Sequence, residues 1–152
     1  MNTRHFMAFL TLAGVLFMAT FRADARPDTG GFRHEPRIAI ATFAANEEQV
    51  RSVAALIKSI RQRGGSYRAS TVYVVIADPG LLPAASLKQE GVEALPLEME
   101  REFMDYPLAL KAFAAAQIEK KAAAAGIDTL IWLDPGVIVL NSLAALDLGE
   151  VF

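Results

Sequence analysis

The pattern of apolar and polar positions in the middle of the chain predicts a strand, a tight turn and an amphipathic helix. Residues 38–43 form a short uncharged run, which is typical of a strand buried on both faces. Asn46 then stands at a helix N-cap position, with Gln49 at the spacing of a capping box. Apolar residues recur at helical spacing, at Val50, Val53, Ala54, Ile57 and Ile60. We expect Gly64 and Gly65 to end this helix.

Strand and helix patterns continue to alternate along the rest of the chain. We expect further strands over residues 71–77, 91–97, 128–134 and 137–140, and helices over residues 83–89 and 106–125. Pro96 places the weak strand 91–97 at a sheet edge or at its own end. The long helix is rich in alanine, and one stripe of it is expected to carry Leu110, Phe113, Ala114 and Gln117.

This alternation predicts the fold class and the place of a ligand. Strands that alternate with helices form a three-layer α/β/α domain with a mostly parallel, Rossmann-like sheet. In such sheets the ligand lies outside the carboxyl ends of the strands. The loops after Phe43, after Ala77 and around Asp134 are therefore the candidate site.

The N-terminal segment has the pattern of a targeting sequence. Residues 6–21 carry no charge and follow Arg4, and Ala23, Asp24 and Ala25 fit the small-x-small rule of signal peptidase. We expect cleavage after Ala25 and a secreted or periplasmic protein. The alternative is a membrane anchor over residues 6–21, a run slightly shorter than a bilayer span.

The expected organisation is a leader or anchor over residues 1–25, a linker over 26–36 and an α/β domain over 37–152. Contact with a membrane is expected only through the N-terminal segment.

Composition excludes several classes of chemistry. The 152 residues include 15 Lys and Arg against 17 Asp and Glu, and a net charge of −2 gives no general reason to bind nucleic acid. Without cysteine the chain has no thiolate zinc site, iron–sulfur cluster, cysteine nucleophile or disulfide. Once the leader is removed His34, in the linker, is the last histidine, which disfavours a Ser-His-Asp triad. Neither a GxGxxG turn nor a GxxxxGK[ST] loop occurs.

Asp134 is the most informative polar position. It follows the apolar run 129–133 and begins an Asp-Pro-Gly turn, so it is placed to hold a divalent cation or a ribose hydroxyl. Alternatively, Asp134 only initiates the turn, as Asp78 does in the same tripeptide at residues 78–80. The acidic stretch 98–102 is interpreted as a solvated loop.

Three stretches together resemble the glycogenin-like retaining glycosyltransferases, whose nucleotide-sugar-binding domain is of the GT-A type. Residues 41–46 (ATFAAN) look like the family's first strand and turn, around the uridine and ribose. Residues 110–113 (LKAF) are similar to its lysine-bearing helix near the diphosphate, and residues 132–140 (WLDPGVIVL) to its Asp-x-Asp segment. The resemblance covers about residues 37–148. It implies a hexosyltransferase that uses a UDP-sugar and an acceptor that the sequence does not identify.

The resemblance also implies roles for individual residues. Lys111 would bind the phosphates, and Asp134 would bind a metal ion or the ribose. The nucleoside pocket would be formed by Thr42, Phe43, Ala44 and Asn46. Asn46 and Lys111 also have simpler interpretations, as a helix cap and as an exposed helix residue.

Two departures from the family pattern define a competing function. Gly136 replaces the second Asp of the Asp-x-Asp pair, so Mn²⁺ or Mg²⁺ would have only Asp134 as a protein ligand. The sequence given also stops at Phe152, short of the family's acceptor-binding half, so we expect the sheet to be incomplete at the C-terminus. The alternative is an exported, non-catalytic α/β binding module derived from a glycosyltransferase.

Overall fold

The centre of the domain is a parallel sheet. The computed structural model describes residues 17–19, 37–82, 87–103 and 106–143. Four parallel strands lie side by side in the order β5 (Thr129–Trp132), β2 (Ile38–Ala44), β3 (Thr71–Ile76) and β4 (Val92–Pro96). The three-residue strand β1 (Phe17–Ala19) pairs with β5 in the antiparallel direction. The expected α/β class is confirmed, and the four predicted strands in this core differ from the observed ones only at their ends.

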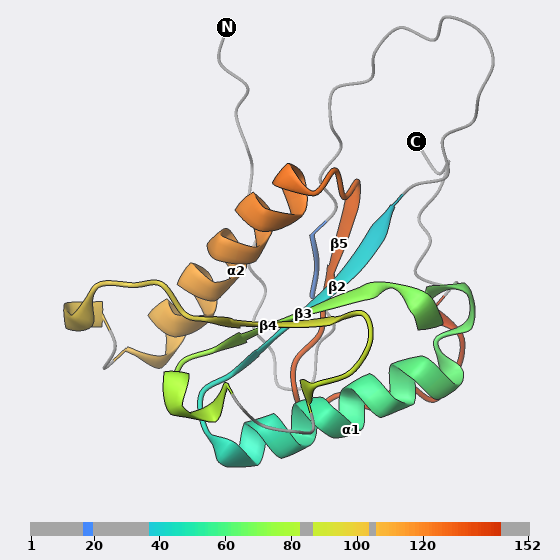
Figure 1. The fold of residues 1–152 in the computed structure, drawn as a ribbon, viewed down its shortest axis with the longest axis horizontal. Helices are drawn as coiled ribbons and strands as arrows, with labels where there is room; N and C mark the ends of the chain where they lie inside the picture. The colour runs from blue at the N-terminus through green and yellow to red at the C-terminus, as the bar shows by residue number, and fades with distance from the viewer. Residues whose placement is uncertain (1–16, 20–36, 83–86, 104–105, 144–152) are drawn as a thin grey trace, which may run out of the picture.

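Helices cover both faces of the sheet, α1 (Glu47–Arg63) on one side and α2 (Pro107–Ala124) on the other (Figure 1). Strand β2 contributes to both cores. Ile40 and Ala44 pack in the core that contains α1, whereas Ala41 and Phe43 pack in the core that contains α2. A strand covered on both faces must be apolar at every position, which explains the uncharged run. The described residues thus form the three expected layers.

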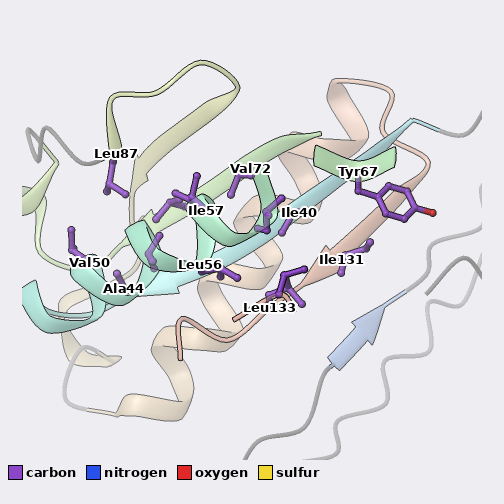
Figure 2. Close-up of a cluster of buried hydrophobic side chains, with 14 of the residues drawn as sticks. Ile40, Ala44, Val50, Leu56, Ile57, Tyr67, Val72, Leu87, Ile131 and Leu133 are labelled. Atoms are coloured by element: carbon purple, nitrogen blue, oxygen red, sulfur yellow. The ribbon is translucent and has the colours of Figure 1, made fainter. Parts of the chain in front are cut away.

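Helix α1 begins and ends where the sequence predicts. The Asn46 side chain accepts a hydrogen bond from the Gln49 amide at 3.0 Å, and the Gln49 side chain accepts one from the Ala45 amide at 2.7 Å. At the other end, Gly65 has a φ of +65°, a conformation that favours glycine. Figure 2 shows Val50, Leu56 and Ile57 of α1 facing the side chains of β2 and β3.

Helix α2 differs in part from its predicted stripe. Its buried residues are Ala114, Ile118 and Ala122. The prediction of Phe113 on the buried stripe is wrong, because its side chain is 38 % exposed and its ring stacks on Phe103 with centroids 5.6 Å apart. Because alanines occur on several faces of this helix, the periodicity of apolar residues does not identify which face is buried.

The predicted strand over residues 137–140 does not form. The segment instead runs along α1, where the Val139 amide donates to Ser59 Oγ at 3.0 Å and the Leu143 amide donates to the Gly64 carbonyl at 3.3 Å. Val139 is buried and Ile138 is half exposed, so burial alternates as in a strand. The apolar run is therefore partly buried, but α1 provides its packing partner in place of another strand.

Some sequence predictions fall outside the described residues. The predicted helix over 83–89 lies largely there, as do the linker, the proposed cleavage site and most of the apolar run 6–21. Among the residues that the structure describes, no helix combines the length and apolarity needed to cross a membrane.

Candidate functional site at the carboxyl edge of the sheet

The candidate site lies where β2 and β5 end side by side. From β2 the chain adds β3 and then β4 on one side, and it later returns to add β5 on the other side of β2. The topological switch point of the sheet therefore lies between β2 and β5. Such a switch point is where open α/β sheets bind ligands. Asn46 follows β2, Asp134 follows β5, and both α1 and α2 begin at this edge (Figure 1).

Asp134 and Lys111 meet at this edge. Lys111 Nζ donates a hydrogen bond to Asp134 Oδ2 at 2.8 Å, although the residues are 23 positions apart in the sequence. Both side chains keep 47 % of their surface exposed. The lysine comes from the second turn of α2 and the carboxylate from the end of β5. The pair therefore connects a covering helix to the sheet at the switch point.

The second carboxylate oxygen of Asp134 supports the turn. Its Oδ1 accepts a hydrogen bond from the Gly136 amide at 3.2 Å, as expected for a residue that initiates an Asp-Pro-Gly turn. The structure thus shows the turn role of Asp134, which uses Oδ1, while Oδ2 accepts the hydrogen bond from Lys111.

These contacts determine the pKa of Asp134. Partial burial raises the pKa, but the hydrogen bonds from Lys111 and Gly136 and the lysine charge together hold it below the ordinary value of an aspartate. The carboxylate is therefore charged at neutral pH.

Asp78 is an internal comparison for Asp134. It begins the same tripeptide, and its Oδ1 accepts a hydrogen bond from the Gly80 amide at 2.9 Å. Among the described residues no ion pair involves Asp78. Turn formation therefore needs no lysine, and the contact with Lys111 is an addition specific to Asp134.

The residues predicted for the nucleoside pocket lie at different depths. The side chains of Thr42, Phe43 and Ala44 are buried in the two cores. Among the described atoms, Thr42 Oγ1 has no hydrogen-bond partner. Asn46 is exposed at the edge, and its Oδ1 caps α1. The structure thus brings Lys111 and Asp134 together, leaves Asn46 at the same edge and places the three strand residues inside the fold.

The donor groups around Asp134 do not suit a resident divalent cation. Mg²⁺ and Mn²⁺ require oxygen ligands, and Asp134 is the single carboxylate of residues 132–140. Both Asp134 oxygens already accept hydrogen bonds. Within the described ranges, no group of three or more His, Asp or Glu side chains could hold a metal ion.

Sequence reasoning missed two features near the start of α2. Tyr106 occupies the N-cap position without a side-chain cap bond, and it is 63 % exposed. Leu108 is 77 % exposed one turn before Lys111. An aromatic residue at an N-cap, where Ser or Asp is usual, is the signal that could have revealed the uncapped end.

No protein-family model, no curated protein and no solved structure matches the chain at a significant level.

Proposed function

We propose that the domain binds a nucleotide sugar, with UDP as the nucleotide, and serves as the donor-binding part of a glycosyltransferase of the GT-A type. The observation that supports this most strongly is the meeting of Lys111 and Asp134 at the switch point. The sequence resemblance selects the same two residues from separate motifs.

Lys111 is suited to the diphosphate of the donor. An ammonium group carries three N–H donors, and its hydrogen bond to Asp134 uses one of them. The carboxylate thereby fixes the direction of a side chain that is otherwise flexible. The amino end of α2, where the Tyr106 side chain makes no cap bond, adds favourable potential for an anion close to Lys111.

Asp134 is suited to a ribose hydroxyl. A carboxylate at a strand end of a Rossmann-like sheet accepts hydrogen bonds from ribose. Asp134 is half exposed and ionised, so each oxygen can accept a further bond beside those from Lys111 and Gly136.

The proposed transfer step breaks the bond between the anomeric carbon and the β-phosphate oxygen. The electron pair of that bond stays on the departing UDP, where the Lys111 ammonium stabilises the added charge. An acceptor hydroxyl forms the new bond to the anomeric carbon, and its proton passes to the solvent. The acceptor is therefore a hydroxyl-bearing molecule.

Calorimetric titration of the full chain with UDP and UDP-glucose tests the binding, and release of UDP in the presence of sugar acceptors tests the transfer. We expect saturable binding at the carboxyl edge. Binding without release of UDP would favour the non-catalytic binding module, which Gly136 in place of a second Asp supports. Absence of binding at millimolar nucleotide, in a sample that circular dichroism shows to be folded, would contradict the proposed nucleotide-sugar binding and leave the non-catalytic module as the remaining alternative.

A further inference from the structure

We infer that the Lys111 ammonium takes the place of a divalent cation at this site, so that nucleotide binding by this chain is independent of metal. The inference rests on the proposed function and specifies how the diphosphate charge is neutralised. It departs from the cation requirement that the resemblance to the glycogenin-like family implies.

The position of Lys111 carries the argument. Its Nζ lies 2.8 Å from Asp134 Oδ2, one of the two oxygens that the only carboxylate of residues 132–140 could offer to a cation. A cation such as Mg²⁺ binds a carboxylate oxygen at about 2.0–2.1 Å. It would therefore lie beside the ammonium, with two positive charges competing for one oxygen.

The other oxygen of Asp134 is also directed toward a hydrogen-bond donor. Asp134 Oδ1 accepts the Gly136 amide hydrogen at 3.2 Å, and this bond belongs to the turn itself. A cation at Oδ1 would compete with this N–H group. Both oxygens thus accept hydrogen bonds from donors that the protein supplies, one of them the charged Lys111 ammonium.

The chemistry that Lys111 offers to a diphosphate replaces part of what a cation offers. An ammonium carries a full positive charge and can donate hydrogen bonds to the phosphate oxygens. It is held at the site by its hydrogen bond to Asp134. The charge is therefore already present when the nucleotide arrives.

Gly136 provides a variant that should restore a metal site. Its backbone is outside the left-handed region, and a Cβ added there would meet Asp134 Oδ1 at 3.7 Å, an ordinary van der Waals contact. Gly136→Asp should therefore fold and place a second carboxylate beside the first. Gly136→Asn has the same shape without the charge and is the matched control.

Two measurements on the full chain test the inference. In the first, electron paramagnetic resonance follows the signal of free Mn²⁺ with no nucleotide present. We expect the wild-type chain and Gly136→Asn to leave this signal unchanged and Gly136→Asp to reduce it. If the wild-type chain reduces the signal and Asp134→Asn abolishes that effect, the inference is overturned.

In the second measurement, UDP is titrated in EDTA and in Mn²⁺. We expect the wild-type dissociation constants to agree within about threefold and Gly136→Asp to gain about tenfold in Mn²⁺. UDP binding that requires Mn²⁺ overturns the inference and leaves the proposed function standing. A folded chain that binds UDP in neither buffer overturns the proposed function and the inference with it.

Discussion

The ammonium of Lys111 on α2 lies 2.8 Å from the carboxylate of Asp134 at the end of β5. The contact connects a covering helix to the sheet at the point where the topology reverses. It also has an internal reference, because Asp78 forms the same turn and no ion pair among the described residues.

Lys111→Met should weaken UDP binding by about tenfold or more, because a hydrogen bond to a charged group contributes about 1.5–3 kcal/mol. Lys120→Met is the matched control, since Lys120 is an exposed lysine of the same helix and its loss changes the net charge equally. Calorimetric dissociation constants of both variants check this. An equal loss in the two variants would show that only general charge is involved.

Asp134 should titrate below the ordinary aspartate pKa of about 3.9. The pKa is held down in the folded chain, so the contribution of the pair to stability is present above that pH and is lost as pH falls through the folded pKa. Lys111→Met should raise the pKa of Asp134, because it removes the hydrogen bond and the charge that lower it. Carbon-13 NMR titration of the Asp134 carboxyl measures both values. An unchanged midpoint in the variant would show that the lysine contact does not persist in solution.

Ser59→Ala should lower the free energy of unfolding by about 1–3 kcal/mol, because it leaves the buried Val139 amide without its acceptor. Ser52→Ala is the control, since the Ser52 hydroxyl bonds only to the Glu48 carbonyl of its own helix and lies near the surface. We expect that variant to stay within about 0.5 kcal/mol of wild type. Urea denaturation measures the unfolding midpoint of both variants. Equal midpoints would show that the bond from Val139 to Ser59 does not hold residues 137–143 against α1.

Asn46→Ala should destabilise the fold by about 1 kcal/mol through loss of the α1 cap, while Asn46→Ser should be nearly neutral because serine caps equally well. The pair of variants also separates the two interpretations of Asn46. Weaker UDP binding by Asn46→Ser, at unchanged urea midpoint, would indicate that the amide group contacts nucleotide. Unchanged binding would leave Asn46 as a cap alone.

The sequence predicted the fold well where one local pattern determined the outcome. The uncharged run of β2 and the caps of α1 left few alternatives, and both are as expected. Phe113 was misplaced because an alanine-rich helix has no sharp apolar direction. Residues 137–140 were misassigned because an apolar run indicates burial but not the partner of its backbone amides, which for Val139 is the Ser59 hydroxyl of α1.

The candidate site was predictable residue by residue but not as an arrangement. Lys111 and Asp134 each stood out in the sequence, and the order of strands and helices predicted that Asp134 follows a strand at the carboxyl edge of the sheet, where the structure has it. Their direct contact depends on how α2 packs across the sheet. This packing involves small buried residues such as Ala114, and no sequence motif encodes it. The depth of Thr42 likewise follows from packing on both faces of β2.

The most direct test of the account is a UDP titration of the full chain followed by amide NMR shifts. We predict that the largest changes occur at Asn46, Lys111 and Gly136, the residues at the carboxyl edge. Changes confined to the opposite edge, around Arg61 and Gly91, or no changes at millimolar UDP, would contradict the proposal that this switch point binds a nucleotide.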